Sequence, residues 1–197
     1  MAESRAVLAF TAALILAVAA HDHSGKRHGL PQIMRDLDKC CEAPMPLCHS
    51  NFEGCKMKQK SAGGERTPPT PYQRMCMMEC AFKNFNYSSG GNIDVEVMKA
   101  AFVNSVNSTW QTRARESVDF CLNELKTKFQ SSSVPAPPSG EKVCDAIPGF
   151  LLICVHVRYY ATCSPDINTS GCASNLDKLV KMDYMDLLLN GDSAASK

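Results

Sequence analysis

Apolar and polar positions repeat with a helical period in five segments of the chain. Residues 72–85 carry apolar side chains three and four positions apart, and residues 93–106 and 110–129 continue this pattern. Residues 143–161 are apolar almost all round, which is typical of a buried central helix, and residues 176–189 form a last amphipathic segment. Sustained alternation with a period of two is absent. The pattern predicts an all-α protein.

We expect each apolar stripe to face the interior of a helical bundle. Asn92 or Asp94 is placed to cap the second helix, and Pro148 should bend the fourth or mark its true start. The residues expected to face inward are Met75, Met78, Phe82, Val97, Ala100, Ala101, Val106, Val118, Cys121, Leu122, Leu125, Phe129, the run 150–155, Leu176, Leu179, Val180, Met182, Met185 and Leu189.

The first 20 residues are typical of a cleaved signal peptide. Arg5 precedes a charge-free apolar run that ends in small residues, and a polar stretch begins abruptly at His21. The run is too short to span a membrane, and cleavage after Ala19 or after Ala20 fits equally well. Residues 60–71 and 131–140, rich in Gly, Pro and Ser, are expected to be loops within one domain over residues 21–197.

Charge and cysteine content narrow the class of protein. The net charge is +1, from 21 basic and 20 acidic side chains, so no basic field exists to hold nucleic acid. The chain has 11 cysteines, and after a signal peptide these are typical of a disulfide framework in a secreted protein. The sequons at Asn86, Asn107 and Asn168 are candidate glycosylation sites.

The cysteine spacing indicates helices tied to one another. Cys76 and Cys80 lie one turn apart on one face of a predicted helix, too far apart to bridge each other, so each should bind a different segment. Cys154 and Cys163, separated by eight residues, can do the same from another helix. Each bridge contributes about 2–4 kcal/mol, so the bridges can replace core contacts that a hollow interior lacks.

This spacing resembles the insect odorant-binding proteins, and specifically their Plus-C subclass. The six core cysteines of that family correspond to Cys55, Cys76, Cys80, Cys121, Cys154 and Cys163, and the extra cysteines of the subclass to Cys40, Cys41, Cys48, Cys144 and Cys172. One departure is Ser164, which stands before Pro165 where the subclass usually has proline directly after the sixth core cysteine.

The resemblance implies a fold and a set of disulfide bonds. The fold would be a disulfide-stapled helical bundle enclosing an apolar cavity, with core pairs Cys55–Cys80, Cys76–Cys154 and Cys121–Cys163. Because 11 is odd, one cysteine is free or pairs between molecules, and we expect it among Cys40, Cys41 and Cys48.

The resemblance also implies the function. It predicts a secreted carrier that reversibly binds small hydrophobic ligands such as odorants or pheromones and takes them through aqueous lymph to membrane receptors. The 10 methionines suit a pocket that accepts varied shapes. Tyr159 or Tyr160 could orient a ligand with its hydroxyl. The expected lining residues are Met78, Phe82, Phe102, Trp110, Phe150, Leu151, Val155, Tyr159 and Leu188.

Other functions remain open. A general lipid or hormone carrier fits the residues equally well, as does a secreted structural or interaction protein without a small ligand. Cys40-Cys41 near His49 is reminiscent of secreted phospholipases A2, but the base and the calcium loop are missing, so no enzyme, cofactor or metal is expected. The chain could be a monomer or a homodimer, and protonation of the buried His156 could release ligand, although a structural core histidine is the simpler interpretation.

Overall fold

The computed structural model describes residues 32–41, 43–45, 52, 54–55, 69–89, 91–129, 134–163 and 170–190, and the predicted signal peptide lies outside them. They form helices α2 (Gln32–Leu37), α3 (Pro71–Asn84), α4 (Val95–Asn104), α5 (Ser108–Lys128), α6 (Ile147–Ala161), α7 (Ser170–Lys181) and α8 (Tyr184–Asn190). A two-stranded antiparallel hairpin, β1 (Ser88–Ser89) and β2 (Asn92–Ile93), joins α3 to α4. The mostly helical class predicted from the sequence is confirmed.

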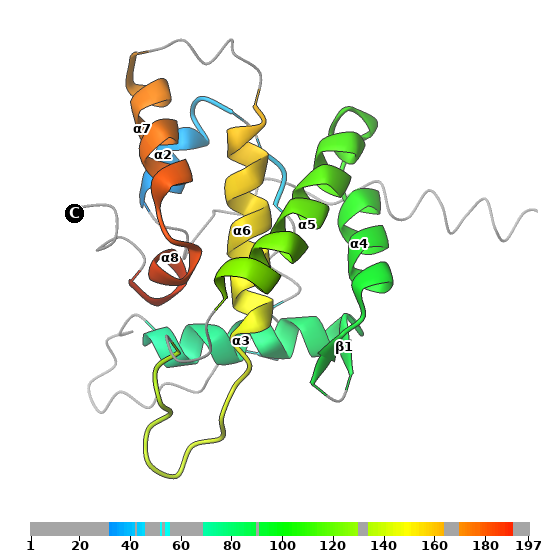
Figure 1. The fold of residues 1–197 in the computed structure, drawn as a ribbon, viewed down its shortest axis with the longest axis vertical. Coiled ribbons are helices and arrows are strands. Elements are labelled where there is room, and N and C mark those ends of the chain that lie inside the picture. Colours follow the sequence, from blue (N-terminus) through cyan, green and yellow to red (C-terminus); the bar gives the residue numbers. More distant parts are fainter. Residues whose placement is uncertain are drawn as a thin grey trace, which may run out of the picture.

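Helix α6 stands at the centre, as Figure 1 shows. It packs on α5, α3, α8 and α7, while α4 packs on the outer side of α5 and α2 packs on α7. Twelve of the fifteen residues of α6 are buried, as its almost continuous apolar sequence predicts. Pro148 lies in its first turn, and the helix begins at Ile147. Of the two expectations for Pro148, that it marks the true start of the helix is confirmed, so the apolar segment from Val143 is helical only from Ile147.

Local polar residues fix where several helices begin. The Thr70 hydroxyl accepts from the Gln73 backbone N–H at 3.2 Å, and the Gln73 side chain accepts from the Thr70 N–H at 3.0 Å, a complete capping box before α3. Asp94 accepts from the Val97 N–H at 3.1 Å, so Asp94 caps α4.

The last predicted helix is two helices. The carboxylate of Asp183 accepts from the backbone N–H groups of Met185 and Asp186, at 2.8 and 3.1 Å. It therefore caps a new helix, α8, where residues 176–189 were expected to continue as one. The short helix α2, with Ile33, Met34 and Leu37 buried, was not predicted because six residues show less than two helical repeats.

Some predicted inward faces were wrong. Val97 and Val180 are exposed, at 43% and 41%, and Ala100 is exposed as well. Helix α4 packs mainly against α5, so only a narrow stripe is covered, which holds Met98 and Phe102. Val180 lies about 100° around α7 from the buried Leu179. Among the described residues, no helix is long and apolar enough to cross a membrane.

Candidate functional site

Five disulfide bonds tie the described helices together, and their paired Cα atoms lie between 5.1 and 6.2 Å apart. The bonds connect elements far apart in the sequence, so they fix the arrangement of helices around α6. The pairs are Cys40–Cys172, Cys41–Cys163, Cys55–Cys80, Cys76–Cys144 and Cys121–Cys154.

One of the three core pairs implied by the family resemblance, Cys55–Cys80, is present. The other two were wrong. Cys76 pairs with Cys144 rather than Cys154. The segment just before α6 lies against α3, because the Asp145 backbone N–H donates to the Glu79 carboxylate at 3.2 Å. Cys154 lies seven residues into α6, about 10 Å further along the helix, beyond the reach of the Cys76 sulfur.

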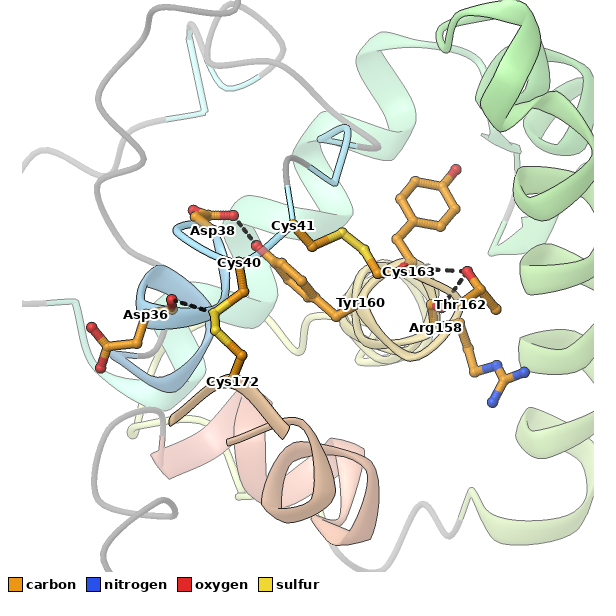
Figure 2. The surroundings of a disulfide bond; sticks show 10 residues. Asp36, Asp38, Cys40, Cys41, Arg158, Tyr160, Thr162, Cys163 and Cys172 are labelled. Atoms are coloured by element: carbon orange, nitrogen blue, oxygen red, sulfur yellow. Dashed lines mark hydrogen bonds between the residues drawn. A yellow bond between two sulfur atoms is a disulfide. The ribbon is translucent and has the colours of Figure 1, made fainter. Parts of the chain in front are cut away.

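The direction in which each cysteine points around the axis of α6 explains why Cys121 pairs with Cys154 and not with Cys163. Cys154 and Cys163 are nine positions apart, which at 100° per residue places them about 180° apart around the helix direction. Cys154 faces α5 and pairs with Cys121. Cys163, just beyond the last turn, faces the opposite side and pairs with Cys41, so the expected Cys121–Cys163 pair is replaced. Figure 2 shows the Cys41–Cys163 and Cys40–Cys172 bonds side by side after α2.

Adjacent cysteines therefore serve two different helices. Cys40 holds α7 and Cys41 holds the end of α6, so α2 is fixed to both. The five bonds use ten of the 11 cysteines, and the eleventh is Cys48, which lies outside the described residues.

The predicted lining residues all belong to, or pack against, one continuous apolar core. Met78 and Trp110 are half-buried, and the other seven are buried. They do not converge on one point. Five of them lie in three separate aromatic groups, which are Phe82 with Tyr87 and Phe102, Trp110 with Tyr159, and Phe150 with Phe129 and Tyr184.

The aromatic groups have well-defined geometry. The Phe82 and Phe102 rings meet edge to face at 6.5 Å, and Tyr87 packs against both at 5.6 and 5.8 Å. Trp110 lies 5.7 Å from Tyr159. Tyr87 and Tyr184 were not in the predicted set. Tyr87 lies between α3 and the hairpin, outside any helical stripe, and Tyr184 is the first residue of α8, whose separate start the sequence analysis did not predict.

Helix α8 packs against α6 near its first turn, where Gly149 meets Leu188. An added Cβ at Gly149 would lie 2.8 Å from Leu188 Cδ2, so this glycine allows the two helices to approach closely. The guanidinium of Arg74 donates to the backbone oxygens of Leu188, Leu189 and Pro69, which satisfies carbonyls at the end of α8.

His156 is buried, at 2% exposure, and its ring stacks on Tyr160 with centroids 5.2 Å apart. The Tyr160 hydroxyl donates to Asp38, which follows α2 (Figure 2). Within the described residues no group of three or more His, Cys, Asp or Glu side chains could hold a metal ion.

Two further features lie on the surface. An open hollow over the hairpin and the start of α4 contains none of the predicted lining residues; it is formed by Ser89 and residues 92–96. Of the sequons, Asn86 and Asn107 are exposed, and Asn168 lies outside the described residues. The Thr109 hydroxyl donates to the Asn107 side-chain oxygen at 2.6 Å.

The described helices pack around α6 and are tied to one another by disulfide bonds, so the fold is that of a disulfide-stapled helical protein. Residues 40–180 match the model of the AgamOBP47-like family. The chain belongs to this family of insect odorant-binding proteins, which is of the Plus-C type, as the cysteine spacing indicated.

A curated relative agrees with this assignment. The chain is 24% identical over 153 residues to odorant-binding protein 47 of Anopheles gambiae, a match over 71% of this chain and 64% of the relative. The chain therefore spans less than two thirds of the relative's length. The family consists of binding proteins, so a small-ligand carrier is the function class that it supports.

Proposed function

We propose that this chain is a secreted carrier that reversibly binds small hydrophobic ligands, such as odorants or pheromones, between its helices. It would release them to membrane receptors after transport through aqueous lymph. The observation that carries the proposal is the interior of the family fold, which holds three aromatic groups, two of them on α6, among helices tied by covalent bonds. No catalytic step is part of the proposal.

The bridges support reversible binding physically. A helix pair that opens to admit a ligand loses apolar contacts, each buried side chain contributing about 1.5–3 kcal/mol. In this chain, covalent bonds from α6 and the segment before it to α5, α2 and α3 keep the helices in register while side chains rearrange. The methionines Met98 of α4 and Met185 of α8 are buried and can change shape at low cost.

Secretion is the second part of the proposal. A signal peptide over residues 1–20 would carry the chain into an oxidising compartment, where the five bonds form and persist. Asn86 and Asn107 are exposed and would accept glycans there without disturbing the core.

The test is displacement of an apolar fluorescent probe, N-phenyl-1-naphthylamine, from the oxidised mature protein by a panel of volatiles, fatty acids and sterols. We expect some volatiles to displace the probe at about micromolar concentration, a binding free energy of about −8 kcal/mol. The same protein after reduction and alkylation is the control and should lose binding.

The panel also separates the alternatives. Displacement by lipids or sterols but by no volatile would favour a general lipid or hormone carrier. A folded, oxidised protein that takes up no probe would contradict the carrier function and favour an interaction or structural role.

A further inference from the structure

Two adjacent tyrosines in the last turn of α6, Tyr159 and Tyr160, have hydroxyls in different surroundings. Tyr160 points toward α2, where its hydroxyl donates to Asp38 and its ring stacks on His156 (Figure 2). Tyr159 lies about 100° around the helix, fully buried, with its ring 5.7 Å from Trp110 of α5. The two neighbouring tyrosines therefore contact different helices: Tyr159 contacts α5, and Tyr160 contacts the end of α2.

The Tyr159 hydroxyl is buried, and no described residue offers it a hydrogen-bond partner. Burial also raises the pKa of this phenol above its usual value near 10, so it keeps its proton and can donate. A buried donor without an acceptor lowers stability, so such groups are rare in folded proteins and call for an explanation.

A second buried hydroxyl without a hydrogen-bond partner among the described residues lies in the seam where α5 packs on α6. Ser117 of α5 is 1% exposed, and its hydroxyl also has no partner among the described residues. Helices α5 and α6 are antiparallel, since Phe129 meets Phe150, Cys121 bonds Cys154, and Trp110 meets Tyr159. Ser117 and Tyr159 therefore both lie on the Trp110 side of the Cys121–Cys154 bond.

We propose that the Tyr159 hydroxyl is the polar anchor of the ligand site, where it donates a hydrogen bond to an oxygen acceptor of an otherwise apolar ligand. This inference rests on the carrier function proposed above and specifies its ligand class. The ligand would be a ketone, aldehyde or ester whose carbonyl reaches the α5–α6 seam, while its chain packs against the Trp110–Tyr159 ring pair. A hydrocarbon would leave the hydroxyl without a partner and bind more weakly.

The experiment compares two ligands and three proteins. A long-chain methyl ketone and the n-alkane with the same number of heavy atoms compete for N-phenyl-1-naphthylamine on the wild type, Tyr159→Phe and Tyr160→Phe. We expect Tyr159→Phe to weaken ketone binding about 5- to 15-fold and to change alkane binding less than twofold, since only one hydroxyl is removed. Tyr160→Phe should leave the ketone-to-alkane ratio unchanged.

Several results would overturn the anchor. An equal change for both ligands in Tyr159→Phe, or none for the ketone, would assign the hydroxyl to a buried water or to packing alone. Failure of the wild type to bind probe or either ligand would contradict the carrier function itself and the anchor with it.

A spectroscopic measurement needs no variant. Infrared spectra of the ketone bound to the wild type should show the carbonyl stretch shifted to lower wavenumber than in hexane, as hydrogen bonding weakens the C=O bond. A band at the hexane position would contradict the anchor even if Tyr159→Phe did not fold.

Discussion

Single residues set contacts in this protein that a stripe of apolar positions does not specify. Tyr159 and Tyr160 are identical neighbours in the sequence, yet one packs on Trp110 and the other binds Asp38. The capping box of Thr70 and Gln73 acts within one helical turn, so its spacing was open to prediction. The hydrogen bond from Tyr160 to Asp38 joins residues 122 positions apart, so the sequence could not predict it.

Gly149 provides a test of close packing at this scale. We expect Gly149→Ala to lower the free energy of unfolding by about 1 kcal/mol, because the strain of displacing the buried Leu188 exceeds the gain in helix propensity. Urea unfolding followed by circular dichroism measures the change. Gly171→Ala in α7 is the matched control, since its Cβ would meet open space, and it should lose no stability. A gain at Gly149 equal to that at Gly171 would contradict the packing of α8 on α6.

At the scale of elements, helix phase decides the disulfide pairing. Cys76 and Cys80 were expected to bind different segments, and they do, Cys144 and Cys55 respectively. The prediction failed where it carried over the family's partners, because Cys154 faces α5 while Cys144 lies beside α3. The break at Asp183 shows the same limit, since one carboxylate caps the start of a separate helix there.

Disulfide mapping tests this arrangement. Mass spectrometry of peptides from the oxidised, alkylated protein, digested at acid pH to prevent exchange, should find peptides linked by Cys76–Cys144 and by Cys121–Cys154. After reduction, each pair should separate into its component peptides. Recovery of Cys76–Cys154 with Cys121–Cys163 would instead restore the pairing implied by the resemblance and contradict the contact of α3 with the start of α6.

At the scale of the molecule, one core serves both stability and the proposed binding. The buried residues of α5 and α6 include Ser117 and Tyr159, whose hydroxyls have no hydrogen-bond partner among the described residues. A group that is buried in its neutral form also makes stability depend on pH. Burial raises the pKa of Tyr159 in the folded protein, so its contribution is present below the unfolded pKa near 10 and is lost as pH rises toward the folded pKa.

We therefore expect alkaline destabilisation that depends on Tyr159. Between pH 8 and pH 10.5 the unfolded phenol ionises while the folded one does not, which lowers the free energy of unfolding by about 0.8 kcal/mol for this group. Urea unfolding at both pH values measures the loss. The protein used is oxidised, with its five disulfide bonds intact and only the remaining cysteine, Cys48, alkylated. Tyr159→Phe should lose about 0.8 kcal/mol less than the wild type over this interval, and an identical loss in both proteins would contradict the burial of a neutral phenol.

The sequence by itself determined the helical class, the buried central helix, a disulfide framework and the family. Each is encoded locally or in spacing, as a 3.6-residue period, an apolar run or the intervals between cysteines. Only the tertiary structure decided which cysteines meet, which apolar residues remain exposed, and which of the two tyrosine hydroxyls has no hydrogen-bond partner among the described residues. These depend on the rotation of each helix against its neighbours. If a helix turns by 100° about its axis, the next side chain in the sequence takes the place of the one that faced the neighbouring helix. The spacing of residues along the chain does not specify this rotation.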